Sequence, residues 1–279
     1  MNKKSMAERN DFNFNFLKTI IIRFDYSGLS ENELEKSIVQ IKELLCQGKY
    51  KYNRMYKKLR SEIQIQLNDP DMIDDEARMG NNSFQQVYVF ENETNGIQLI
   101  LSTDYVMVLI EKKKYVNFEN YGKVLQEVVK LLADTITFFY PVRFGLRKIN
   151  QCILEDIQDL NNYFSSDYFK FFSLGSDSNM QIFQAKDCFD IDEYKVNYQR
   201  AIIRGKMENK SAYQVLIDSE IYLRDAELIL EILKDFDRMK TMNEILFEIY
   251  LESITSEFIE KLKKKEFHDD KIMEVEKNE

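Results

Sequence analysis

Continuous and periodic apolar stretches predict that the chain opens with a strand and a helix. Residues 17–26 are rich in β-branched side chains and end just before Gly28, which is typical of a strand. A helix is predicted next, because Ser30 and Glu33 have the spacing of a capping box and the following apolar residues recur on one face. Gly48 stands where the C-terminal cap of this helix would be.

The middle of the chain predicts an antiparallel meander, then a helix and another strand. Strand patterns at 84–91, 97–103 and 105–113 are separated by turns that are too short for a crossover connection. Residues 117–136 have the apolar periodicity of an amphipathic helix, and residues 141–152 read as a strand.

The second half resembles the first only in the order of its elements. A helix near 154–171 is predicted to precede strands at 195–207 and 212–222, and a long helical tail follows. We therefore expect an α+β fold with antiparallel sheets, packed helices and two similar β-α-β halves. The halves would be an N-terminal domain over 1–150 and a C-terminal domain over 151–279, or one continuous domain.

Composition is that of a soluble globular protein, with 44% hydrophobic and 31% charged residues. The 20 Phe and 16 Tyr residues, with no Trp, predict an aromatic core. The formal net charge of -9 argues against general coating of nucleic acid, because such binding neutralises phosphates with Lys and Arg.

Cysteine spacing and the absence of long apolar runs favour a cytoplasmic protein. Cys46, Cys152 and Cys188 form no Cys-x-x-Cys pair, which indicates reduced thiols and no zinc ribbon. The first residues lack the apolar core of a secretory signal, and no run reaches the about 18 apolar residues of a membrane span.

The scarcity of histidine excludes several classes of active site. His268 is the one histidine and stands in a charged C-terminal segment, so Ser-His-Asp triads and clustered-histidine metal sites are not expected. No glycine-rich phosphate loop occurs either. We therefore predict no catalytic residues, no metal site and no cofactor.

Two pairs of carboxylates have a conceivable chemical role. Asp104, Glu111 and Lys113 resemble the acid and Glu-x-Lys set of metal-dependent nucleases, but seven residues of strand would separate the two carboxylates by about 23 Å. Asp218 and Glu220 share one face of a predicted strand. They would serve metal or acid-base chemistry, or simply lie on a solvent face, which we favour.

A basic, tyrosine-rich segment is the candidate nucleic-acid surface. Residues 49–60 contain six basic residues and no acidic one, and Arg54, Lys57 and Lys58 stand among three tyrosines. Such a segment suits single-stranded nucleic acid, which combines phosphate charge with base stacking. The alternative is an amphipathic segment with lysines extended over an apolar stripe, within the less regular region 49–80.

Residues 141–152 place two arginines in a strand. Arg143 and Arg147 flank Gly145 on one face by the two-residue period, and Asn150 follows. We favour a structural role, in which Arg147 and Asn150 bond to carboxylates or to carbonyls at a helix end, over an anion-binding site.

Four short stretches, in order, resemble the signatures of one family. GLRKIN (145–150), YLESIT (250–255), YQVLIDSEIY (213–222) and YVNFENY (115–121) are similar to motifs of a sporadically distributed family of bacterial and archaeal proteins. The family usually has an aromatic at Lys148 and an isoleucine at Ser219, so the chain departs from its pattern there. The resemblance implies no particular activity, and the patchy distribution of the family hints at defence-related genes.

These observations favour a non-catalytic protein-interaction or accessory protein, with a role in phage defence as the further expectation. The partner would be another protein or a second copy, bound through the C-terminal helix, whose apolar residues lie on more than one side. The alternative is a nucleic-acid-binding protein that uses residues 49–60, with a metal-dependent nuclease as its extension.

Overall fold

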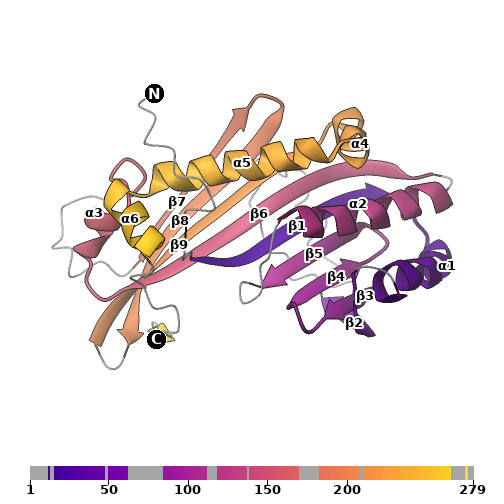
Figure 1. Cartoon of the computed structure of the whole chain (residues 1–279), viewed down its shortest axis with the longest axis horizontal. Coiled ribbons are helices and arrows are strands. Elements are labelled where there is room, and N and C mark those ends of the chain that lie inside the picture. The colour runs from indigo at the N-terminus through magenta and orange to yellow at the C-terminus, as the bar shows by residue number, and fades with distance from the viewer. Residues whose placement is uncertain are drawn as a thin grey trace. The chain divides into compact units, whose positions relative to one another are not determined.

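The structure is a computed structural model, and its elements alternate between strands and helices in a way that matches an α+β protein (Figure 1). It describes Phe12 and residues 16–47, 50–61, 84–111, 118–136, 138–169, 182–207, 210–264 and 274–275. The predictions for Gly48, Lys113 and His268, and part of that for 115–121, lie outside the described residues.

The strands are β1 (Leu17–Ser27), β2 (Arg54–Ser61), β3 (Phe84–Asn92), β4 (Ile97–Leu101), β5 (Tyr105–Glu111), β6 (Tyr140–Leu154), β7 (Ile182–Ile191), β8 (Tyr194–Met207), β9 (Lys210–Leu223) and β10 (Glu274–Val275). The helices are α1 (Glu31–Lys42), which continues into a π-helical turn η2 (Glu43–Gln47), α2 (Phe118–Thr135), α3 (Asp159–Tyr163), α4 (Ala226–Lys234), α5 (Phe236–Ser253) and α6 (Ser256–Lys264).

The strands belong to one antiparallel sheet, which confirms the α+β fold class. The order along the sheet is β10-β8-β9-β6-β1-β5-β4-β3-β2, and β7 pairs with β8 outside this path. β7 and β10 pair with different parts of the same edge of β8. Residues 182–191 of β7 pair with residues 194–203 of β8, and the two residues of β10 pair with Gly205 and Lys206.

Two compact units share this sheet, and each combines segments that are distant in sequence. Unit 1 contains residues 1–21, 145–223 and 235–279, and unit 2 contains residues 22–144 and 224–234. Strands β1 and β6 each pass from one unit into the other, so the expected boundary at 150 and 151 corresponds to neither unit by itself.

Unit 2 contains the predicted meander. Strands β3, β4 and β5 pair in sequence through short turns, as their spacing predicts. The capping box that begins α1 is confirmed, since Ser30 and Glu33 exchange side-chain and backbone hydrogen bonds. The predicted apolar face of α2 is buried. The side chain of Gln126 donates to the carbonyls of Ile232 and Leu233 at 2.9 and 3.0 Å, which ties α2 to the last turn of α4.

Unit 1 places α5 across β8 and β9 (Figure 1). The hydroxyls of Tyr198 in β8 and Ser253 in α5 are 2.6 Å apart and both side chains are buried. Phe258 of α6 stacks on Tyr163 and on Phe16, with ring centroids 5.0 and 5.4 Å apart. The predicted aromatic core is thus present where helices meet strands.

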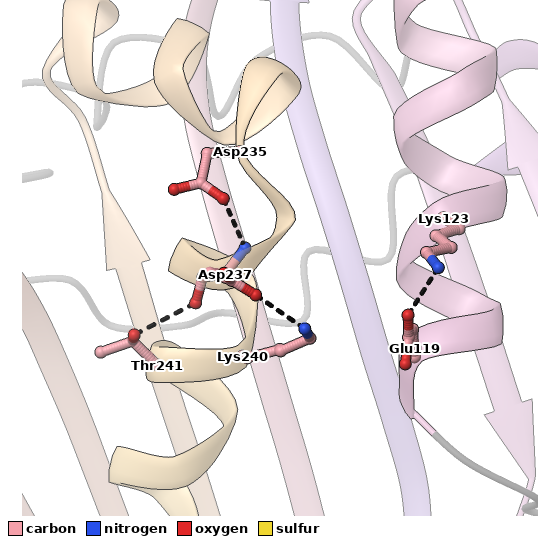
Figure 2. Close-up of polar contacts among 6 residues, drawn as sticks. All are labelled: Glu119, Lys123, Asp235, Asp237, Lys240 and Thr241. Atoms are coloured by element: carbon pink, nitrogen blue, oxygen red, sulfur yellow. Dashed lines mark hydrogen bonds and ion pairs between the residues drawn. The ribbon is translucent and has the colours of Figure 1, made fainter.

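The helical segments in the second half of the chain are shorter than predicted. A helix over 154–171 was expected, but α3 has only five residues, because Phe164 leaves the helix to form a β-bridge with Ile254. The single long C-terminal helix is also wrong, since it divides into α4, α5 and α6. Asp235 begins α5 as an N-cap that accepts from the N–H of Asp237 (Figure 2).

Two strands were missed by the sequence pattern. β2 lies within the region read as irregular, and β7 precedes the first strand predicted in the second half. Both stand at an edge of the sheet, where a strand has few buried neighbours. The apolar alternation that reveals a half-buried strand is therefore weak in both.

No helix in the described part of the chain combines the length and the hydropathy that crossing a membrane requires.

Gly28 is required where β1 ends. Its φ is +101°, and a Cβ added there would lie 1.7 Å from the carbonyl oxygen of Phe138. The adjoining Phe139 packs on Phe24 and Tyr26, with ring centroids 5.9 and 5.2 Å apart, so the contacting segment is held in place.

We predict that Gly28→Ala lowers the free energy of unfolding by about 2–4 kcal/mol, because backbone strain and a main-chain clash add together. Urea unfolding followed by circular dichroism measures the change. Gly96→Ala is the matched control, since Gly96 also has a positive φ of 59° but a Cβ there would meet nothing within 4 Å. It should cost about 1–2 kcal/mol, the penalty of the conformation alone. Equal losses in the two variants would contradict the clash.

Candidate functional site

Arg147 and Asp218 form a buried ion pair between β6 and β9. The Nε of Arg147 donates to one carboxylate oxygen of Asp218 at 2.7 Å, and an Nη of Arg147 donates to the other oxygen. The side chains are 11% and 8% exposed. This two-pronged geometry matches the fork of a guanidinium to the two oxygens of a carboxylate. The favoured bonding of Arg147 to a carboxylate is therefore present, and the corresponding bond of Asn150 stays a prediction.

The same face of the sheet continues the polar contacts toward β7. Glu220 of β9 is 4% exposed and accepts from the side-chain amide of Asn197 in β8 at 3.3 Å. Asn197 in turn accepts from the thiol of Cys188 in β7 at 3.1 Å. We call Arg147, Asp218, Glu220, Asn197 and Cys188 the polar row. It crosses four neighbouring strands in the order β6, β9, β8, β7.

Electrostatics favour the charged form of the arginine in this row. Burial opposes the charge on Arg147, but the hydrogen bonds and the charge of Asp218, with a contribution from Glu220, raise the pKa of the guanidinium above its usual value. The buried positive charge of Arg147 is therefore compensated within the fold by the carboxylate that it contacts.

The solvent-face interpretation of Asp218 and Glu220 is wrong. They share a face, as their spacing predicts, but they are 6% and 4% exposed. The two-residue period identifies which residues share a face and does not say which face is covered. Arg147 and Asn197 bond to these acids, so the polar row links four strands through side-chain hydrogen bonds.

Arg143 has an acid beside it in unit 2. Its guanidinium lies 3.9 Å from the carboxylate of Asp25, which also accepts from the Nε of Arg23 at 2.6 Å. Arg143 and Asp25 are each 16% exposed. Asn150, the third candidate of this stretch, is 8% exposed. Binding of an anion by any of the three stays a prediction.

The carboxylates proposed for a nuclease are not assembled. Asp104 precedes β5 and Glu111 ends it, so the strand separates them as expected. Within the residues that the structure describes, no group of three or more His, Cys, Asp or Glu side chains is arranged to hold a metal ion.

Arg54, Lys57 and Lys58 of the segment 49–60 lie on β2, an edge strand, and the first two have acids beside them. Arg54 is 3.1 Å from Glu93 and 3.9 Å from Glu91, and Lys57 is 3.3 Å from Glu35. Lys58 is exposed. Lysine on an edge strand is a common defence against unwanted strand pairing. The local acids reduce the positive potential that nucleic acid would require.

One hollow in unit 1 has a volume of about 470 Å³. It is lined by Glu155, Asp156, Ile157, Gln158, Arg204, Ser211 and Tyr213. Arg204 donates to Ser211 at 3.0 Å, so its guanidinium is already engaged there. The hollow contains none of the polar row.

The outer edge of β7 is an exposed sheet edge of unit 1. This strand of ten residues pairs with β8 on one side, and no other described strand pairs with it. Ile182 and Phe189 are 56% and 39% exposed, which makes them two of the few large apolar side chains exposed among the described residues. An exposed edge strand with apolar side chains is a template for pairing with another chain.

The backbone groups available at this edge follow from the hairpin geometry. β7 and β8 are joined by two residues, Asp192 and Glu193, so Ile191 and Tyr194 form a hydrogen-bonded pair. Hydrogen-bonded and non-bonded pairs then alternate. The residues of β7 with even numbers therefore direct their N–H and C=O groups away from β8. We call β7 with these outward groups the open edge.

Side chains on both faces hold the open edge in place. Cys188 bonds to Asn197 on one face. On the other, Arg200 of β8 pairs with Asp187, and its guanidinium stacks over the ring of Tyr198 at 4.8 Å. Arg200 is 7% exposed, so this pair fixes the hairpin. A strand held in this way presents its backbone as a rigid template.

The sequence did not reveal the open edge, although a signal for it exists. IFQAKDCFDI begins and ends with large apolar residues and is followed by a tight turn, and this combination is consistent with a strand. Its centre is polar, however, because neither face of β7 is buried. Periodicity therefore could not separate it from a loop.

Comparison with known proteins leaves the family open. No family model matches the chain, and no curated protein is similar to it at a significant level. The resemblance noted from short motifs stays a prediction. Two of its stretches are nevertheless neighbours in unit 1, through the pair of Arg147 with Asp218, and Ser253 of a third stretch bonds to Tyr198 of β8.

We predict that Asp218→Asn destabilises the protein by about 3–5 kcal/mol, because it leaves the buried charge of Arg147 without its counter-charge. Urea unfolding measures the loss. Lys240→Gln is the control in the same unit. It removes an exposed pair with Asp237, shown in Figure 2, whose side chains are 49% and 75% exposed. That pair should contribute at most about 1 kcal/mol. A small, equal effect in both variants would exclude a structural role for the buried pair.

Proposed function

We propose that this chain is a non-catalytic protein-interaction protein and that the open edge of β7 is its docking surface. The single observation that carries the proposal is an edge strand of ten residues with outward backbone groups and with Ile182 and Phe189 exposed. A partner strand added there would gain main-chain hydrogen bonds, and apolar side chains at both ends would add contact area.

The state of the polar residues supports an interaction role over catalysis. The buried acids of the polar row are bonded to Arg147 and Asn197, so they are not poised to exchange protons with a substrate. The thiol of Cys188 is likewise engaged, since it donates a hydrogen bond to the side-chain amide oxygen of Asn197.

Other expectations from the sequence have less support. Self-association through the C-terminal helix was expected because its apolar residues lie on more than one side. None of the large exposed apolar side chains among the described residues belongs to α5, so this helix offers no exposed apolar face for such contact. Nucleic-acid binding through Arg54, Lys57 and Lys58 must overcome the neighbouring acids. A role in phage defence rests on the motif resemblance alone.

We predict that Cys188→Pro abolishes partner binding, because proline removes an outward N–H at the centre of the open edge without removing a main-chain hydrogen bond to β8. Cys188→Ala is the matched control, since it loses the thiol but keeps the N–H. Tagged full-length chain is used to capture proteins from its native cells, together with an untagged copy of the chain, and mass spectrometry identifies and quantifies them.

Support requires a protein that wild type and Cys188→Ala retain and that Cys188→Pro loses by at least about tenfold, the change expected when a central ladder contact is lost. Circular dichroism and a thermal melt check that the proline variant remains folded. If the captured proteins are the same for all three chains, or if none is captured, β7 is not a docking surface.

A further inference from the structure

We infer that the partner of the open edge is a second copy of this chain, paired β7 to β7 in antiparallel orientation with Cys188 at the two-fold axis. This inference rests on the proposed function, since it names the occupant of the same edge. It is carried by the charge pattern of β7 and by the exposure of that strand.

Symmetry restricts how two such edges can meet. A two-fold axis perpendicular to the sheet relates the copies, so residues that face each other must lie on the same face of the sheet. Even residues therefore pair with even residues and odd with odd. The outward N–H and C=O groups belong to the even residues, so the even pairs carry the hydrogen bonds between the two copies.

Charge then distinguishes between the registers. With Lys186 at the axis, two lysines oppose each other, and with Asp187 at the axis, two aspartates do. With Cys188 at the axis, Lys186 of each copy lies opposite Asp190 of the other, and no like charges meet. Opposite charges directly across a strand pair stabilise it, whereas like charges weaken it. The register centred on Ala185 pairs as many residues of β7, 182–188, as the register centred on Cys188, 185–191, but it places Lys186 opposite Gln184 and therefore forms no ion pair. Registers centred closer to either end of the strand leave fewer residues paired.

Lys186 and Asp190 are available for these contacts. Within the described residues Lys186 has no acidic partner, although it lies near the centre of β7. Asp190 is 68% exposed and lies 3.8 Å from Lys195, a long and solvent-exposed pair that contributes little. Its second oxygen can accept from Lys186 of the second copy. A lysine that would otherwise protect the edge thus becomes the group that selects the register.

The opposite face of the paired strands is compatible with this register. Asp187 would lie across from Phe189 of the second copy, but its carboxylate is held by Arg200 of its own hairpin. Ala185 would lie across from Ile191, an apolar pair. The exposed ring of Phe189 would lose contact with water.

Charge reversal gives a direct test with the full-length chain. Sedimentation velocity over a range of concentrations measures the dimer dissociation constant of wild type, Lys186→Asp, Asp190→Lys and the double variant. Each single reversal creates two repulsive pairs at once and should weaken the dimer at least about tenfold. The double variant exchanges both charges and should recover an affinity within about threefold of wild type.

Mixing the two single variants provides the sharper readout. Lys186→Asp supplies acids at both positions and Asp190→Lys supplies lysines at both, so each dimerises poorly alone, while the mixture should form a heterodimer.

Mild oxidation should link wild-type copies through Cys188, because Cα atoms of a hydrogen-bonded antiparallel pair lie about 5.5 Å apart, within disulfide range. Cys188→Ser should not cross-link. Lys58→Asp, on β2, is the control for a general effect of charge and should leave the dimer unchanged.

The outcomes separate this inference from the proposed function. A wild-type chain that is monomeric at all concentrations, or a dimer unaffected by either reversal and by the mixture, overturns the β7 pairing. If a different captured protein still depends on the N–H of Cys188, the interaction function stands with another partner. If neither a dimer nor such a protein is found, both proposals fail.

Discussion

The buried ion pair of Arg147 and Asp218 is the constraint around which unit 1 is organised. Removing two charges from water is costly, so the pair is tolerable only where both oxygens of the carboxylate meet the fork of the guanidinium. That requirement fixes β6 against β9. Glu220 adds negative charge nearby and holds Asn197, which in turn bonds to Cys188. These bonds continue the polar contacts from β9, which carries Asp218, through the neighbouring β8 to β7.

Three of the motif stretches contribute residues to the packing of unit 1. Arg147 lies in GLRKIN and Asp218 in YQVLIDSEIY, while Ser253 of YLESIT ends α5 and bonds to Tyr198. Thr255, the last residue of that stretch, accepts from the N–H of Phe258 at 3.2 Å and so begins α6. Each of these residues performs a structural task. Residues with such tasks specify an architecture and are silent on activity.

Elements that bury one face were predictable, and those that bury neither were not. The capping residues Ser30 and Glu33, the meander and the buried face of α2 all carry a strong local or periodic signal. β2 and β7 lack that signal because edge strands are exposed on both faces. The open edge was missed for the same reason, because it belongs to β7. The buried polar row was missed for a different one. Sequence placed Asp218 and Glu220 on one face, but only tertiary packing determines that this face is buried.

The two edge strands differ in the charges and apolar side chains that they expose, and this difference favours β7 as the contact surface. β2 carries Arg54, Lys57 and Lys58, and acids of its own unit lie beside the first two. β7 carries a single lysine without an acidic partner in the described chain, and it leaves Phe189 exposed. The ammonium group of Lys186 has no carboxylate beside it in the described residues, and a carboxylate placed directly across a strand pair from it would stabilise that pairing. Because Asp190 lies four residues from Lys186 on the same face of the strand, a second β7 supplies that carboxylate in antiparallel register.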